Sequence, residues 1–331
     1  MNFLSFIITF LVSIIFAPVV IKLTKKLKLG QNILGYVEEH SAKQGTPTMG
    51  GVIFILPSIL VSLFFLKSNL TMPILCLAVF LAYGIIGFLD DFIKIKFKRN
   101  LGLRPYQKII FQLLLAIIVA VFVYKNNLIG SSVFIPFTVN KINLGWFIIP
   151  FVITVLLATT NSVNLTDGLD GLAGSVSLIF FIAITLVSSF YLNFSTIAMQ
   201  SEYSVQIQNL INICWCVSGG LLAFLVFNFY PAKIFMGDTG SLSLGGLMGV
   251  VCCFSGTSLY IPIIGFMFVV SSLSVIIQVL YFKKTKKRVF LMAPFHHHLQ
   301  HKGMYETKIV FIYIVITLLL TLMTLMFLGF V

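Results

Sequence analysis

Charged residues are scarce in this 331-residue chain. Only 9% of the residues are Asp, Glu, Lys or Arg, 59% are hydrophobic, and the mean hydropathy is +1.07. So little polar surface cannot coat a soluble globule, which excludes a soluble enzyme or binding domain. An apolar run of about 20 residues can cross a membrane, and ten runs of roughly that length alternate with short polar connectors. We therefore predict an all-α polytopic membrane protein with one integral-membrane domain over residues 1–331.

The distribution of positive charge predicts how these runs are oriented. The ten predicted spans cover residues 3–21, 52–66, 73–89, 108–124, 144–160, 172–190, 210–227, 242–254, 261–282 and 309–330. Of 22 basic residues, only Lys67, Lys125 and Lys141 then fall outside, in agreement with the positive-inside rule. Both termini are predicted outside. The first span lacks a preceding basic region, so we expect a retained span rather than a cleaved signal peptide.

Cysteine patterns and other common signatures are also missing. The five cysteines lie inside apolar runs, without the spacing of a metal site or a disulfide framework. The net charge of +13 could indicate nucleic-acid binding, but the basic residues cluster at alternate span ends, so we assign them to topology and expect no nucleic-acid partner. No inverted internal repeat of the kind found in many transporters is evident.

Acidic residues are few, and the aspartates gather at one side. Under the predicted topology all five aspartates and all five histidines fall at inner span ends or inner loops. Because charge near the membrane is costly, such a gathering indicates a shared acidic site. The aspartates are Asp90, Asp91, Asp167, Asp170 and Asp238.

The stretch 161–171 follows an apolar segment and spaces Asn161, Asn164, Asp167 and Asp170 three residues apart. We expect its glycines to end the helix there, so that both carboxylates can converge on one ligand. A capped helix end followed by a turn is the alternative.

A pair of adjacent aspartates ends the third predicted span. Lys94 follows Asp90 by four residues, so an ordinary helix-surface ion pair is one interpretation. Adjacent carboxylates repel each other, however, and Asp90 and Asp91 also suit a divalent cation or a proton-transfer task.

Two glycine-rich stretches suit phosphate chemistry. Residues 236–241 precede the eighth predicted span, where we expect Thr239 or Ser241 to cap the helix and Asp238 to lie beside its free N–H groups. This arrangement suits a magnesium-bound diphosphate, and a tight Asx turn is the alternative. Lys43 lies just before residues 45–51, where the backbone can approach a phosphate closely.

His296, His297 and His298 are consecutive in the sequence. Consecutive side chains on a helix point in different directions and no cysteine accompanies these, so we expect phosphate contacts rather than zinc binding. Gln278 is a lone amide in an apolar run, for which an interhelical hydrogen bond is the default explanation.

Together these motifs resemble the polyprenyl-phosphate N-acetylhexosamine-1-phosphate transferase superfamily, and within it the phospho-N-acetylmuramoyl-pentapeptide transferases. The resemblance spans essentially the whole chain, and the triple histidine is similar to the muramoyl-pentapeptide branch. The motifs that carry it are residues 45–51, 90–94, 161–171, 235–241 and 293–298.

The resemblance implies a homodimer in the bacterial cytoplasmic membrane, with ten transmembrane helices and an Mg²⁺-dependent site that faces the cytosol. It also implies UDP-N-acetylmuramoyl-pentapeptide as donor and undecaprenyl phosphate as acceptor. The products would be lipid I and UMP.

By residue match, the resemblance implies a magnesium site at Asp238 with Asp167, which is also essential for catalysis. Asp90 and Asp91 would serve the acceptor phosphate or the proton. Contacts to substrate phosphates or sugar are implied for Lys43, Lys108, Asn164, His296, His297 and His298. The implied uridine pocket consists of Leu169, Asp170, Asn228, Phe235 and Gln278, and the remaining candidate substrate-binding residues are Thr48 and Ser241.

Two other functions stay open at the level of sequence. Within the superfamily, the donor could be UDP-N-acetylglucosamine. Outside it, an ion-coupled transporter also combines many spans with buried acids, but would hold those acids near the bilayer midplane rather than at inner span ends.

Overall fold

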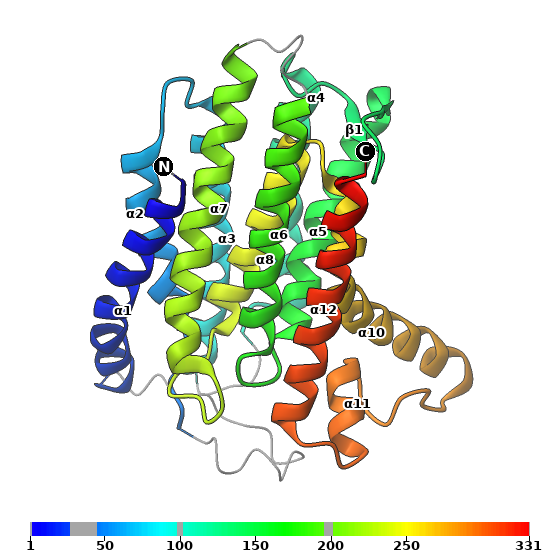
Figure 1. Cartoon of the computed structure of the whole chain (residues 1–331). Coiled ribbons are helices and arrows are strands. Elements are labelled where there is room, and N and C mark those ends of the chain that lie inside the picture. The colour runs from blue at the N-terminus through cyan, green and yellow to red at the C-terminus, as the bar shows by residue number, and fades with distance from the viewer. Residues whose placement is uncertain (1, 27–44, 98–101, 195–200, 331) are drawn as a thin grey trace.

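A computed structural model describes residues 2–26, 45–97, 102–194 and 201–330, and shows an elongated bundle of helices (Figure 1). Its longer helices are α1 (Asn2–Lys26), α2 (Val52–Phe65), α3 (Thr71–Lys96), α4 (Pro105–Lys125), α5 (Ile148–Thr166), α6 (Leu172–Phe194), α7 (Ser201–Asn228), α8 (Gly237–Phe254), α10 (Phe266–Thr285) and α12 (Glu306–Leu328). The shorter elements are β1 (Ser132–Phe134), β2 (Lys141–Asn143), η2 (Gly145–Phe147), η4 (Ser258–Tyr260), α9 (Ile261–Ile264) and α11 (Phe295–His301). Lys43 lies outside the described residues.

The chain is a polytopic membrane protein, as predicted from its hydropathy. Within the described ranges, nine helices are long and apolar enough to cross a membrane. The second predicted span is the exception, because α2 has only 14 residues. At 1.5 Å per residue such a helix covers about 21 Å, which is less than the hydrocarbon thickness of about 30 Å.

Two amides on α7 hold the connection between α2 and α3. The buried Asn209 accepts a hydrogen bond from the Lys67 N–H at 2.9 Å, and the buried Gln206 accepts one from the Met72 N–H at 2.8 Å. Irregular backbone near a bilayer core needs partners inside the protein. These amides therefore satisfy backbone N–H groups that the connection after the short α2 leaves without helical partners.

Two predictions about secondary structure are wrong. The predicted span 261–282 is broken at Gly265 into α9 and α10, and α10 leans away from the bundle in Figure 1. The loop predicted between the fourth and fifth spans contains an antiparallel hairpin, in which Val133 pairs with Ile142. The hairpin is anchored because Phe134 stacks on Tyr191, with ring centroids 4.0 Å apart. The all-α class holds for the rest of the described chain.

Helix α8 forms the centre of the bundle and packs closely on α3. It is 89% buried, whereas α10 is only 22% buried. At Gly87 of α3 a Cβ atom would overlap the carbonyl group of Asp238 at the start of α8. This close approach brings the end of α3, with Asp90 and Asp91, against the first turn of α8.

The two chain ends lie toward the same end of the bundle, and α11 lies at the opposite end (Figure 1). Gly168, which follows Asp167, lies against His296 of α11, and Asn164 near the end of α5 donates to Asp238. The aspartates at the end of α5 and at the start of α8 therefore lie toward the α11 end.

Substituting Gly87 tests the contact between α3 and α8. We expect Gly87→Ala to destabilise the protein by about 1–3 kcal/mol, because the added methyl group meets backbone that cannot move away. Gly84→Ala is the matched control one turn earlier, where the Cβ would lie 3.4 Å from Ile55 Cδ1 and Ser243 Oγ. Thermal unfolding in detergent compares the two, and equal stability of both variants would contradict the close packing.

Candidate active site

The N-terminus of α8 is capped by a carboxylate from another helix. Asp91 on α3 accepts hydrogen bonds from the backbone N–H of Asp238 at 3.2 Å and of Thr239 at 3.0 Å. It also accepts one from the Thr239 hydroxyl at 2.8 Å. A negative charge is favourable at this end of a helix dipole. Asp91 therefore joins α3 to α8.

The predicted start of this helix was wrong in three respects. Helix α8 begins at Gly237, so Asp238, Thr239 and Ser241 lie in its first turns rather than before it. Neither hydroxyl caps the helix: Thr239 donates to Asp91, and Ser241 donates to the Gly237 carbonyl at 3.0 Å. The N–H groups of Asp238 and Thr239, which were expected to be free for a ligand, are bonded to Asp91.

Asp238 is the centre of a polar network. Its Oδ2 atom lies 2.8 Å from Lys108 Nζ and 3.0 Å from Lys94 Nζ. Its Oδ1 atom accepts a hydrogen bond from Asn164 Nδ2 at 2.7 Å. Asn164 also donates to Ser241 Oγ at 2.9 Å. Helices α3, α4, α5 and α8 thus meet at one carboxylate.

Asp90 is held from two directions. Lys94 Nζ lies 2.6 Å from its Oδ2 atom, and the Leu103 N–H donates to its Oδ1 atom at 2.8 Å. Lys94 therefore bridges Asp90 and Asp238, and this goes beyond the simple helix-surface pair that its spacing suggested. Lys94 was absent from the predicted site residues, although its position one turn after Asp90 was the signal that could have found it.

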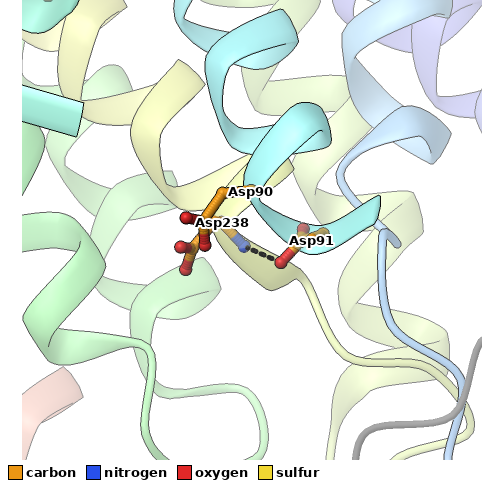
Figure 2. Close-up of side chains that lie close together, drawn as sticks. All are labelled: Asp90, Asp91 and Asp238. Carbon is orange, nitrogen blue, oxygen red and sulfur yellow. Dashed lines mark hydrogen bonds between the residues drawn. The ribbon is translucent and has the colours of Figure 1, made fainter. Parts of the chain in front are cut away.

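Three carboxylates gather closely enough to hold a metal ion. One oxygen atom from each of Asp90, Asp91 and Asp238 lies within 4.8 Å of the others, and Figure 2 shows the two α3 side chains beside Asp238. Asp91 already accepts three hydrogen bonds from the start of α8. A carboxylate has about four lone-pair sites. Asp91 uses three on the backbone and hydroxyl that start α8, whereas Asp238 uses three on the mobile side chains of Lys94, Lys108 and Asn164.

Asp167 follows directly after α5, where the helix ends as the glycines predicted. Among the described residues, no group donates a hydrogen bond to its carboxylate. Burial raises the pKa of the Asp167 carboxyl well above its usual value, and the negative charges of Asp238, Asp91 and Asp170 raise it further. The structure thus gives Asp167 acidic neighbours without a balancing donor of its own.

Asp170 has different surroundings from Asp167. Its carboxylate accepts a hydrogen bond from the Ala232 N–H at 3.0 Å, and its own N–H donates to Glu306 at 2.7 Å. Asn228 accepts from the Gly171 N–H at 3.0 Å and donates to the Ile234 carbonyl at 2.9 Å. The structure therefore brings Asp170 and Asn228 together, away from the partners of Asp238. Sequence reasoning missed Glu306, which no motif marked.

Three further residues predicted to bind substrate lie near these aspartates. Leu169 is buried. Phe235 is half-buried, and its backbone forms hydrogen bonds with Pro47 and Gly50. These bonds bring residues 45–51 against the start of α8. Buried Thr48 lies there against Gly237.

An interhelical hydrogen bond was the default interpretation of Gln278, but within the described ranges Gln278 forms none. Instead its Oε1 atom accepts hydrogen bonds from the N–H groups of Val289 at 3.1 Å and Phe290 at 2.9 Å. Gln278 thus fixes the chain that follows its own helix.

His296 and His297 lie side by side against Gly168, with ring centroids 4.3 Å apart, whereas His298 bonds to a different segment. His296 is fully buried against Gly168, and neither ring nitrogen has a partner among the described residues. Its burial lowers its pKa well below the usual value, and His297 lowers it further. His297 Nδ1 lies 2.7 Å from Gln300 Oε1, and His298 Nδ1 accepts from the Leu291 N–H at 3.1 Å. The expectation of phosphate contacts rather than zinc binding stays a prediction.

Comparisons with known proteins show which family the chain is similar to. Residues 72–256 match the model of Glycosyl transferase family 4, and residues 43–55 match signature 1 of the phospho-N-acetylmuramoyl-pentapeptide-transferases. The chain is 44% identical over 319 residues to the phospho-N-acetylmuramoyl-pentapeptide-transferase of Clostridium novyi (strain NT), covering 96% of this chain and 94% of that protein. It is 45% identical over 318 residues to the protein of the same name from Clostridioides difficile (strain 630), covering 95% and 94%.

Replacing Asp167 by Asn should raise thermal stability in Mg²⁺-free detergent solution. A raised native pKa means that stability is lost as pH rises from the unfolded value of 3.8 through the native pKa. The gain in Asp167→Asn should therefore be small near pH 4 and grow as the pH is raised. Thermal unfolding at a series of pH values measures it.

The matched control is Asp170→Asn, because the Asp170 carboxylate already accepts a hydrogen bond. We expect no comparable gain there. If Asp167→Asn were less stable than the parent at every pH, Asp167 would instead be a stabilising residue of the fold.

Proposed function

Because this chain belongs to the phospho-N-acetylmuramoyl-pentapeptide-transferase family, we propose that it transfers phospho-N-acetylmuramoyl-pentapeptide from its UDP conjugate to undecaprenyl phosphate. The products are lipid I and UMP. The chain is a phosphotransferase by its family, and the substrates, the products and the residue roles given below are our proposal.

The observation that carries this proposal is the contact of two lysines with Asp238. Lys94 and Lys108 place ammonium groups 3.0 and 2.8 Å from one Asp238 oxygen, beside Asp90. Phosphoryl transfer needs reactants in line and neutralisation of the charge that spreads over phosphate oxygens, with little covalent work by the protein. Positive groups fixed beside carboxylates supply that environment.

The charge of the site fits one divalent cation. The four carboxyl groups of Asp90, Asp91, Asp167 and Asp238 outnumber the ammonium groups of Lys94 and Lys108 by two, so one divalent cation would balance the site with all four carboxylates ionised. Mg²⁺ prefers one or two carboxylates together with phosphate oxygens and water. Asp238 and Asp167 would hold it, since Asp91 caps α8 and Asp167 has no donor among the described residues. A bound Mg²⁺ would neutralise charge on the diphosphate.

The residues around this centre have separate tasks in the proposed reaction. The phosphate of undecaprenyl phosphate attacks the phosphorus next to the sugar, and Asp90 accepts the proton if the acceptor carries one. Lys108 and Asn164, which are joined to Asp238, orient the diphosphate, and UMP leaves. We assign the uridine to the neighbouring group around Asp170, Asn228, Leu169 and Phe235, and phosphate or sugar contacts to Lys43, Thr48, Ser241, His297 and His298.

We place the enzyme in the bacterial cytoplasmic membrane as a homodimer, with this site toward the cytosol. The basic residues of the α11 end support that orientation through the positive-inside rule. Gln278 shapes the loop beside the site, and buried His296 contacts Gly168 rather than solvent.

The choice of donor is the direct test of this function. Purified protein receives undecaprenyl phosphate and Mg²⁺ with either UDP-N-acetylmuramoyl-pentapeptide or UDP-N-acetylglucosamine, and UMP and lipid-linked product are measured. We expect product with the first donor and at least about 100-fold less with the second, because a site built for polar groups rejects substrates that lack them.

The same assay includes Asp238→Asn as an inactive control, with folding checked by gel filtration. Preference for UDP-N-acetylglucosamine would move the chain to another branch of the superfamily. No UMP from either donor would overturn the proposed reaction, and full Mg²⁺-dependent activity of Asp238→Asn would overturn the metal assignment.

A further inference from the structure

A dense positive cluster ends α10, outside the site described above. Five of the six residues 283–288 are basic and all five are exposed: Lys283, Lys284, Lys286, Lys287 and Arg288, here named the α10 basic turn. Lys286 has a left-handed backbone with φ 57° and ends α10 within the cluster. The five cations are close neighbours because they lie within six consecutive residues.

The α10 basic turn has no balancing carboxylate in the part of the chain that the structure describes. None of its five cations forms an ion pair there. Glu306, the acidic residue that begins α12, is engaged with the Asp170 N–H at 2.7 Å. Like charges gathered in this way repel each other, so the cluster favours an anionic partner from outside the chain.

Exposed apolar side chains flank the cluster on both sides. Tyr281 and Phe282 precede it with 43% of their surface exposed, and Val289 and Leu291 follow it with 46% and 50% exposed. Helix α10 itself is only 22% buried and leans away from the bundle in Figure 1. Basic residues interleaved with exposed aromatic and aliphatic residues are typical of a segment at a membrane surface.

We infer that the α10 basic turn binds the anionic phospholipid headgroups of the bilayer, with its apolar neighbours inserted beside them. The occupant is a lipid surface because the flanking apolar residues continue the lipid-exposed side of α10. Several lysines near anionic lipid add up to a substantial attraction. The positive-inside rule alone requires only that such residues stay on one side, and not that they contact headgroups.

Hydrogen bonds link the α10 basic turn to α11, the helix that contains the three consecutive histidines. Gln278 on α10 accepts hydrogen bonds from the Val289 and Phe290 N–H groups directly after the cluster. The Leu291 N–H then donates to His298 on α11 at 3.1 Å. Lipid binding at the α10 basic turn therefore steadies the chain that leads to α11.

Spin-labelled lipids test the inference on the full chain in nanodiscs. A dye is attached through Val289→Cys, since all five native cysteines are buried. Its fluorescence is then measured in two nanodisc preparations. A quenching spin label is carried by phosphatidylglycerol in one and by an equal fraction of phosphatidylcholine in the other. We expect phosphatidylglycerol to quench about twofold more, and the excess to disappear near 0.5 M NaCl because salt screens the attraction.

Two variants with equal charge loss locate the effect. The combined Lys283→Gln, Lys284→Gln and Lys287→Gln variant should show no preference between the two lipids. The matched control neutralises Lys22, Lys25 and Lys26, which are exposed at the end of α1 and should leave the preference unchanged. The combined Lys283→Arg, Lys284→Arg and Lys287→Arg variant should preserve the preference, which separates loss of charge from damage to the fold.

Equal quenching by the two lipids in the parent protein would overturn the inference, whatever the variants do. Equal loss of preference in the α1 variant would also overturn it, because net charge rather than the α10 basic turn would then be responsible. An acidic protein partner, the competing occupant, predicts equal quenching.

Discussion

The hydrogen bonds from the first turn of α8 to Asp91 on α3 are the interaction on which the site depends. They satisfy two backbone N–H groups and one hydroxyl at a buried helix start, where an unpaired donor would cost about 1–3 kcal/mol. Gly87 makes the same helix contact possible by leaving room for the Asp238 backbone. With α3 fixed on α8, Asp90 and Asp238 lie on either side of Lys94. The charges of the candidate site are thus arranged by packing inside the bundle.

Much of this arrangement could be predicted from the sequence. The hydropathy runs predicted the membrane helices, and the gathering of aspartates at one end predicted a shared acidic site. The glycines after Asp167 predicted the end of α5. Each of these signals is local, since it depends on residues within one helix or one turn.

The failed predictions needed contacts between segments far apart in the chain. Asp91 caps α8 from 147 residues away, so Thr239 and Ser241 looked like the only capping groups. The break at Gly265 and the amides that hold the turn after α2 depend on tertiary packing, which a hydropathy run does not record. Lys94 matched a common helix-surface pattern, and only the position of Asp238 reveals that it bridges two helices.

The central claim is that Asp238 and Asp167 hold one divalent cation beside Lys94 and Lys108. Anomalous X-ray scattering from crystals grown with Mn²⁺, which favours the same oxygen ligands as Mg²⁺, would locate the ion directly. The account predicts one peak per chain, within coordination distance of carboxylate oxygens of Asp238 and Asp167. A peak bound by Asp91 without Asp238, or no peak at this end of α8, would contradict it.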